Sequence, residues 1–277
     1  MEAVMDLTKE YGLVLEGGGA KGAYQIGAWK ALQEAGIKLK GIAGTSVGAL
    51  NGALICMGDL EKAEHLWENI SYSQIMSVND QVMGEILKHK KISREALKEL
   101  MDYITDGGLD ISPLKQLIAE SVDEEKIINS PIDLYVLTFN VDEFRELDID
   151  IKEIEPELIK DFLLASAYIF PLFKNERLHG KRYIDGGAIN NVPLSSLVDR
   201  GYENIIMVRI FGIGREKKVK IPEETTIYTV APKVSLGSII DFDRRKSRRH
   251  MKLGYYDTMR LIYGLKGKIY YIDESEE

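Results

Sequence analysis

Cysteine is almost absent from this sequence, and the scarcity limits the setting in which the chain works. The single cysteine among 277 residues, Cys56, has no partner for a disulfide within the chain, which suits a reducing compartment. It lies in an apolar stretch, so we expect a small buried side chain rather than a reactive thiol.

A membrane-spanning run and a secretory leader are also missing. No stretch approaches the ~18 apolar residues that a spanning helix needs. The first ten residues include Glu2, Asp6 and Glu10 and show neither the basic region nor the apolar region of a signal peptide. We therefore expect a soluble, cytoplasmic protein whose contact with a membrane is at most peripheral.

An excess of positive charge is the third absence. The sequence has 36 Lys and Arg against 44 Asp and Glu, a net charge of −8, which argues against general nucleic-acid binding. The apolar fraction of 45% is ample for a core, and no repeat or low-complexity linker divides the chain. We expect a single domain over residues 1–277.

The order of the predicted elements indicates an α/β fold. Apolar patterning predicts a strand over 11–16, a helix over 23–35, a strand over 39–43 and a helix over 47–57. A strand, a glycine loop, a helix and a second strand begin a parallel βαβ unit. Further strands are predicted at 133–139, 147–151, 204–211 and 226–231.

Two segments are helical in pattern. Residues 61–130 carry Glu- and Lys-rich faces with scattered methionines, and the part near 75–87 is a candidate lid over an apolar pocket. Ordinary core packing is the simpler explanation of its apolar residues. A helical C-terminal extension is predicted over 238–265, followed by a short strand at 268–272.

Gly44-Thr45-Ser46-Val47-Gly48 reads G-x-S-x-G and lies between a predicted strand and a predicted helix. This pattern holds a serine at a tight turn, where side chains at the flanking glycines would collide with neighbouring backbone. The helix N-terminus would direct free N–H groups toward Ser46. Five residues alone do not distinguish a nucleophile from an ordinary loop serine.

A second glycine motif, Gly17-Gly18-Gly19-Ala20-Lys21-Gly22, follows the first strand. It satisfies G-x-G-x-x-G, but no Asp or Glu occurs between Glu34 and Asp59 to hold the ribose of a dinucleotide. Successive glycine N–H groups ahead of a helix can instead stabilise an oxyanion beside Ser46. A plain tight turn is the remaining alternative.

Asp185 is the candidate base. A hairpin with a His179-Gly180 turn is predicted to run from 173 to 184, and its return strand delivers Asp185-Gly186-Gly187. Glycine backbone around the carboxylate leaves room for a serine, and partial desolvation would raise its pKa. The four histidines, His65, His89, His179 and His250, lack such support, and His250 is expected on a solvated helix face. We predict a Ser46–Asp185 centre without histidine.

Together these stretches resemble the patatin-like phospholipase family. The resemblance rests on the glycine loop with Gly27 beyond it, on the serine motif, and on Asp185-Gly186-Gly187 with Asn191 and Pro193 following. It covers about residues 11–211 and is weaker after Pro232.

The resemblance implies a three-layer α/β/α sandwich with a mostly parallel sheet. It implies that Ser46 is the nucleophile, Asp185 the proton acceptor, and Gly17, Gly18 and Gly19 the oxyanion hole. The reaction would be hydrolysis of fatty acyl esters of lipids through an acyl-serine, with no metal or cofactor. The supporting residues of the three motifs are Lys21, Gly22, Gly44, Val47, Gly48, Gly186, Gly187 and Asn191.

Two other functions stay open. A small-ester or acyl-thioester hydrolase could use the same centre, and a series of esters of increasing chain length separates it from a lipid hydrolase. A nucleotide-binding regulator could use the glycine loop, although the ribose carboxylate is missing.

A basic cluster stands out in the acidic chain: Arg244, Arg245, Lys246, Arg248 and Arg249. One hypothesis is a docking patch for anionic lipid headgroups, where each basic residue is worth about 1 kcal/mol. The simpler interpretation is a solvated helix face whose charges pair with acidic neighbours.

Overall fold

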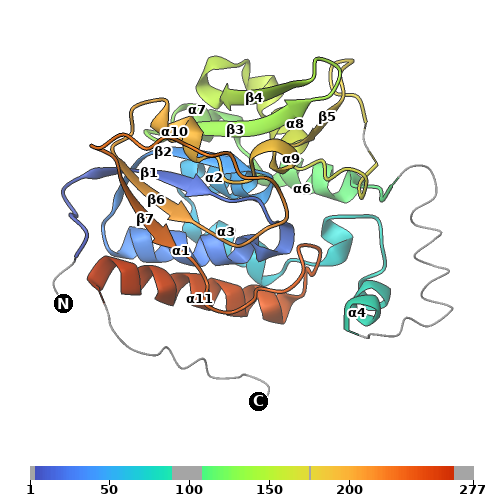
Figure 1. The fold of residues 1–277 in the computed structure, drawn as a ribbon. Coiled ribbons are helices and arrows are strands. Elements are labelled where there is room, and N and C mark those ends of the chain that lie inside the picture. Colours follow the sequence, from blue (N-terminus) through green and yellow to red (C-terminus); the bar gives the residue numbers. More distant parts are fainter. Residues whose placement is uncertain (1–3, 89–107, 175, 265–277) are drawn as a thin grey trace, which may run out of the picture.

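A seven-stranded sheet organises the chain in a computed structural model that describes residues 4–88, 108–174 and 176–264 (Figure 1). The strands are β1 (Glu10–Leu15), β2 (Lys38–Thr45), β3 (Asp133–Asn140), β4 (Arg145–Asp150), β5 (Tyr183–Asp185), β6 (Asn204–Val208) and β7 (Thr226–Val230). Their order is β4-β3-β2-β1-β6-β7, and β5 also pairs with β3. Strands β3, β2, β1, β6 and β7 are parallel, whereas β4 and β5 run antiparallel to β3.

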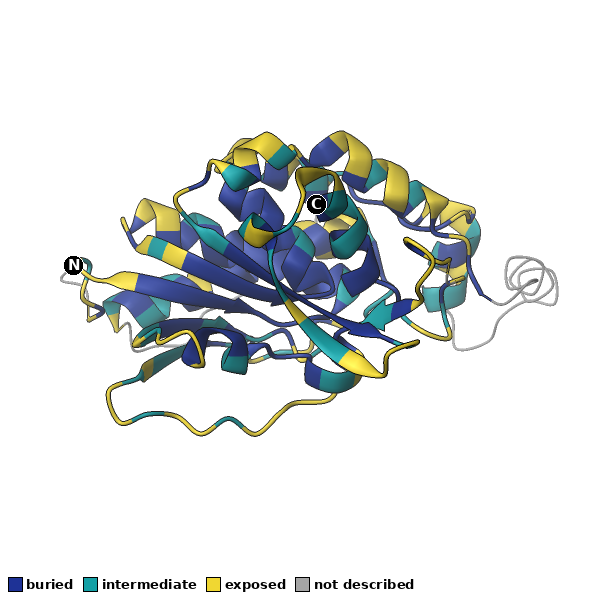
Figure 2. Cartoon of the chain, turned by 90° about the horizontal axis from the view of Figure 1, so that it is seen from above, coloured by how far each residue is buried: buried dark blue, intermediate teal, exposed yellow. Residues whose placement is uncertain are grey.

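Helices cover both faces of this sheet because its strands alternate their apolar side chains. In β1, Leu13 and Leu15 belong to the large core that also contains residues of α1 (Ala23–Glu34) and α2 (Val47–Met57). Val14 points to the other face, into a smaller core with Leu197 of α10 (Leu194–Val198). The two faces give the predicted three-layer α/β/α arrangement, in which the central strands β1, β2 and β3 are largely buried and the edge strands β4 and β7 are more exposed (Figure 2).

In the larger helical layer, the first and the last α-helix of the described chain pack against each other. The long C-terminal helix α11 (Arg244–Tyr263) lies against α1 (Figure 1). A Cβ at Gly27 would lie 2.6 Å from the carbonyl carbon of Met251, and one at Gly254 would lie 2.8 Å from that of Tyr24. These two glycines therefore permit the close approach of the helices. The other helices are α3 (Leu60–Glu68), α4 (Asp80–Lys88), α6 (Ser112–Ser121), α7 (Glu124–Ile128), α8 (Ile159–Ser166) and α9 (Gly187–Asn190), with 3-10 turns at Gly19–Gly22, Tyr72–Gln74, Ile151–Glu153 and Pro156–Leu158.

Several predicted boundaries need correction. The strand predicted over 204–211 ends at Val208, because the N–H groups of Ile210 and Phe211 donate to a buried carboxylate described below. The helix predicted from 238 begins at Arg244, where the Asp243 side chain accepts from the N–H groups of Arg245 and Lys246. The hairpin at 173–184 is reduced to its turn and one Leu178–Lys181 bridge, and β5 pairs with β3 instead. The strand predicted at 268–272 lies outside the described residues.

Candidate functional site

Sheet register brings Ser46 and Asp185 to the same place. Along one edge of β3, Leu137 pairs with Thr45 of β2, and the next residue, Thr138, pairs with Asp185 of β5. Strand β5 therefore continues the edge where β2 stops. Ser46 follows Thr45 directly. Ser46 and Asp185, about 140 positions apart in the sequence, are therefore brought together alongside β3.

Ser46 has a strained backbone. Its φ is 56° and its ψ is −127°, a combination that non-glycine residues avoid. The serine caps α2, where its carbonyl accepts from Ala49 N–H at 2.9 Å. Its own N–H donates to Ser166 Oγ at 2.8 Å, and Ser166 Oγ donates to the Leu137 carbonyl at 2.6 Å. Ser166, on α8, thus ties the turn to β3.

The two motif glycines are required by space. A Cβ at Gly44 would lie 2.5 Å from Ala49 N, and one at Gly48 would lie 2.8 Å from the carbonyl carbon of Leu15. Both contacts are with backbone, which cannot move aside as a side chain can. The turn is therefore compatible only with glycine at these positions, as the sequence pattern predicts.

Asp185 is a partly exposed carboxylate with an altered acidity. Burial raises its pKa to about 6, and hydrogen bonding with the Ser46 side chain and with Gly187 N–H, at 2.7 Å, opposes the rise. Gly186 lies against β3, where a Cβ would be 2.8 Å from the carbonyl carbon of Leu137. A carboxylate with this pKa accepts a proton near neutral pH more readily than an ordinary aspartate.

The glycine loop lies beside the serine. A Cβ at Gly17 would be 3.2 Å from Ser46 Cβ. The Gly17 N–H donates to the Asn191 carbonyl at 3.1 Å, so it is already engaged, while Asn191 Nδ2 donates to the Gly17 carbonyl at 3.1 Å. Within the described part of the chain, the N–H groups of Gly18 and Gly19 donate no hydrogen bond.

Segments from the far end of the chain support this loop. Ala20 N–H donates to the Ile239 carbonyl at 2.7 Å. The Lys21 ammonium donates to the Phe211 carbonyl at 2.6 Å, and burial lowers its pKa. Lys21 therefore acts here as a brace between the glycine loop and the segment after β6.

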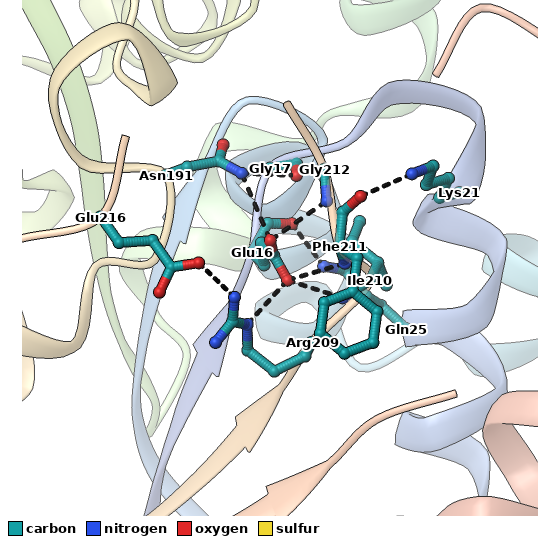
Figure 3. Close-up of polar contacts among 10 residues, drawn as sticks. All are labelled: Glu16, Gly17, Lys21, Gln25, Asn191, Arg209, Ile210, Phe211, Gly212 and Glu216. Carbon is teal, nitrogen blue, oxygen red and sulfur yellow. Dashed lines mark hydrogen bonds and ion pairs between the residues drawn. The ribbon is translucent and has the colours of Figure 1, made fainter. Parts of the chain in front are cut away.

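Sequence reasoning missed Glu16, the residue that organises this region (Figure 3). Its side chain is 1% exposed and accepts from the backbone N–H groups of Ile210, Phe211 and Gly212 at 2.7, 3.0 and 3.1 Å. Arg209 Nε donates to it at 2.9 Å. One feature of the sequence could have revealed this ion pair. Two apolar strands each end in a residue of opposite charge, Glu16 after β1 and Arg209 after β6.

An apolar cavity of about 90 Å³ begins at Ser46 and Gly19. One side is a stripe of α2, with Val47, Leu50 and Leu54 at helical spacing. The polar side chains Asn51 and Ser121 also line it, together with apolar residues from other elements: Leu66, Trp67, Ile70, Ile75, Leu114, Leu117, Ile118, Val122, Ala167, Ile169, Phe173, Ile239, Ile240 and Phe242. A stretch of hydrocarbon fits such a lining. Ile75 lies in the predicted lid segment, and whether that segment moves stays a prediction.

The described histidines lie elsewhere. His65 bonds its neighbour Asn69, and His179 Nε2 lies 2.6 Å from Asp161 Oδ2 on the surface. The expectation that His250 lies on a solvated face is wrong: it is 6% exposed, and burial lowers its pKa to about 4. None of the three lines the cavity, and His89 lies outside the described residues.

Across residues 4–88, 108–174 and 176–264, no group of three or more His, Cys, Asp or Glu side chains is arranged to hold a metal ion. Over the same ranges, no helix has the length and apolar character to cross a membrane. Cys56 is a buried free thiol, as expected, and burial raises its pKa to about 12.

These features define a class of α/β protein in which a strained serine turn, a glycine loop and a carboxylate meet at the carboxyl edge of a parallel sheet. The comparison with family models gives a match over residues 13–198 to the patatin-like phospholipase model. The chain belongs to that family.

Individual relatives agree with this assignment. The chain is 28% identical over 200 residues to neuropathy target esterase sws of Drosophila melanogaster, covering 72% of this chain and 13% of that protein. It is 61% identical over 46 residues to lysophospholipase nte1 of Aspergillus terreus, covering 17% of this chain and 3% of that protein. The chain thus spans a small part of these curated relatives.

Among solved structures, VipD from Legionella pneumophila has a similar fold. The TM-score is 0.54 at 17% sequence identity, over 91% of this chain and 66% of that one. At this identity the likeness concerns the fold alone, which agrees with the predicted α/β/α sandwich.

Proposed function

We propose that this chain is a serine lipid acyl hydrolase, of the phospholipase A or lysophospholipase type, that works through a Ser46–Asp185 dyad. One observation carries the proposal: a strained serine faces a carboxylate whose pKa is about 6, at the end of an apolar cavity. Family membership and the names of the relatives support the substrate class.

The first half-reaction transfers the acyl group to the serine. Ser46 Oγ attacks the ester carbonyl carbon while Asp185 takes the hydroxyl proton, which leaves a tetrahedral oxyanion. The free N–H groups of Gly18 and Gly19 are our assignment for its stabilisation. Asp185 then gives its proton to the departing alcohol oxygen, the ester bond breaks, and acyl-Ser46 remains.

The second half-reaction returns the enzyme. Asp185 takes a proton from water as the hydroxide oxygen adds to the acyl carbon. The tetrahedral species collapses, Ser46 Oγ leaves and recovers the proton from Asp185, and the fatty acid departs. No redox step or metal is required by this sequence of proton and acyl transfers.

The cavity limits which acyl chains fit. Its volume of about 90 Å³ is smaller than the ~150 Å³ of an engineered cavity that binds benzene. As built, it therefore accommodates a short acyl segment, and longer chains require the walls to part. For monomeric esters we expect butyrate and hexanoate to react faster than palmitate.

The test is hydrolysis of p-nitrophenyl esters from butyrate to palmitate by the wild type, Ser46→Ala and Asp185→Asn, each checked for folding. Loss of activity in both folded variants supports the dyad. Activity that survives Asp185→Asn but falls on replacement of His179 or His250 would place the base elsewhere. A strict preference for the shortest esters, with no lipid hydrolysis, favours the small-ester or thioester alternative.

We also propose peripheral contact with a lipid surface. The basic cluster forms the first turns of α11, where Lys246 pairs with Asp241 and the remaining four side chains, Arg244, Arg245, Arg248 and Arg249, are exposed. For Lys246, the ion pair supports the simpler interpretation, in which the charges of this helix face pair with acidic neighbours. Loss of liposome binding when the four arginines are neutralised would support the headgroup patch, and unchanged binding would remove it.

A further inference from the structure

The segment after β6 exposes two large apolar side chains next to the candidate site. Phe211 is 54% exposed and Ile213 is 78% exposed, and neither lines the cavity. Each is followed by a glycine, Gly212 or Gly214, at which a Cβ would collide with a neighbouring segment. We call residues 209–215 the Phe211 loop.

The two glycines of the Phe211 loop lie against the glycine loop at Gly17 and the Asp185 loop at Gly187. A Cβ at Gly212 would lie 2.8 Å from the carbonyl carbon of Gly17, and one at Gly214 would lie 2.6 Å from the carbonyl oxygen of Gly187. The backbone of Arg215 also exchanges hydrogen bonds with its neighbours there, donating to Gly187 at 2.9 Å and accepting from Asn191 at 2.6 Å. Phe211 and Ile213 are thus held in the solvent immediately beside the glycine loop and the Asp185 loop.

The exposure of Phe211 is enforced by the structure. Its φ is 48°, a strained value for a residue with a side chain. Its N–H donates to Glu16 and its carbonyl accepts from Lys21 (Figure 3). A buried carboxylate and a buried ammonium therefore hold one aromatic residue in an unfavourable conformation, in which the Arg209 guanidinium carbon lies 5.5 Å from the ring centroid and Phe211 stays 54% exposed. Strain of this kind collects at functional sites.

The surroundings of the loop suit a phospholipid surface. Arg215 ends the loop, and Lys218 and Lys220 follow it; all three side chains are exposed and form no ion pair among the described residues, while Glu216 between them pairs with Arg209. On the Asp185 side, Phe170 is 68% exposed, and its neighbour Ile169 lines the cavity. Exposed apolar side chains with nearby cations match the acyl boundary and the anionic headgroups of a membrane.

We propose that the Phe211 loop is a membrane anchor that inserts Phe211 and Ile213 into the acyl boundary of a phospholipid surface and so brings the Ser46 cavity to its substrate. This deepens the proposed function and rests on it for the substrate. Rigid attachment of the loop to Gly17 and Gly187 places the catalytic groups at a fixed height above the lipid.

The direct test is Phe211→Trp, read by fluorescence with vesicles of phosphatidylcholine alone and of equimolar phosphatidylcholine and phosphatidylglycerol. The native Trp29 and Trp67 are buried, but Trp67 lines the cavity, so the wild-type emission with the same vesicles is subtracted and the remaining change is assigned to the loop. We expect a blue shift and quenching by brominated phosphatidylcholine. Val4→Trp, at a 70% exposed position whose N–H donates to the Ile262 carbonyl at the far end of α11 from the arginines, is the control and should show neither. Unchanged emission from Phe211→Trp in vesicles that sediment the protein would overturn the proposal.

A second test removes the apolar groups. Phe211→Asn with Ile213→Asn should sediment with vesicles about tenfold more weakly, because two large side chains no longer leave water. Asparagine tolerates positive φ, so hydrolysis of soluble p-nitrophenyl butyrate should be unchanged. Vesicle binding that is unaffected by this variant but lost on neutralising the α11 arginines would contradict the anchor. Unchanged vesicle binding together with the loss of binding to a protein partner would also contradict it. Absence of ester hydrolysis in the wild type, with the fluorescence shift still seen in Phe211→Trp, would contradict the proposed function and leave the anchor standing.

Discussion

The candidate site is built by two regions that differ in how the sequence specifies them. Residues 10–57 form two strand-to-helix turns whose shape follows from local sterics, since Gly44 and Gly48 meet backbone within a few residues or on the adjacent strand. Residues 209–243 have little regular structure, and contacts with Glu16, Ala20 and Tyr72 hold them in place. The comparison teaches that Ser46 and the glycine loop lie on locally encoded turns, while the segments that support them, like the pairing of β5 with β3 that places Asp185, depend on long-range contacts.

Glu16 links the two regions, and its substitution should have the largest effect on stability and activity. Glu16→Gln places an amide donor against backbone N–H groups and leaves Arg209 without its buried charge partner. We expect a loss of about 3–5 kcal/mol in the free energy of unfolding and a fall in kcat, measured by urea denaturation and ester kinetics.

The matched control is Glu216→Gln, which removes the exposed partner of the same arginine. An exposed ion pair is worth at most about 1 kcal/mol, so this change should be nearly silent. Equal effects of the two substitutions would mean that Glu16 does not organise the second region.

The locally encoded turn is tested by Gly48→Ala. The new methyl group meets Leu15 backbone, so we expect a loss of about 1–3 kcal/mol in stability from overpacking. A displaced serine should also lower kcat about hundredfold. Gly84→Ala on α4, where a Cβ has open space, should instead be neutral or stabilising. Full activity of folded Gly48→Ala would show that the turn tolerates a side chain.

The cavity is shared by both regions and can be shortened at its far end. Leu54 lies eight residues along α2 from Ser46, about 12 Å at the rise of a helix. Leu54→Trp should lower kcat/KM about tenfold for decanoate esters and leave butyrate unchanged. Leu87→Trp, outside the cavity lining, controls for the added ring. A uniform loss over all chain lengths would mean that acyl chains do not run along α2.

The smallest loss of stability is expected in the 238–242 segment, which contributes to the cavity wall. Tyr72 donates to Asp241 at 2.8 Å and so ties the 238–242 segment to the helical layer. Tyr72→Phe should cost about 1 kcal/mol in stability, read by thermal melting. Tyr255→Phe, which removes a bond to Glu34 at the surface, should cost less. A larger loss at Tyr255 would reverse the ranking of the two contacts.

The sequence predicted the parts of the fold that depend on neighbours in the chain. Apolar patterning and glycine spacing placed α2 at Val47–Met57 and the turn at Ser46. The end of β6 was missed because Glu16, about 190 residues earlier, takes up the N–H groups that would have continued the strand. Burial of His250 was missed for a similar reason, since a basic helix stretch gives no sign of which face packs against the neighbouring helices α1 and α3.

The most direct test of the dyad is the pH dependence of kcat/KM for p-nitrophenyl butyrate, with Asp185→Asn and fluorophosphonate labelling of Ser46 in parallel. Asp185 must be ionised to accept the proton, and its pKa is raised to about 6. Activity should therefore rise with pH through about 6 and level off above it, and Asp185→Asn should abolish turnover and slow the labelling of Ser46. The same rising limb and undiminished activity in folded Asp185→Asn would contradict the Ser46–Asp185 dyad.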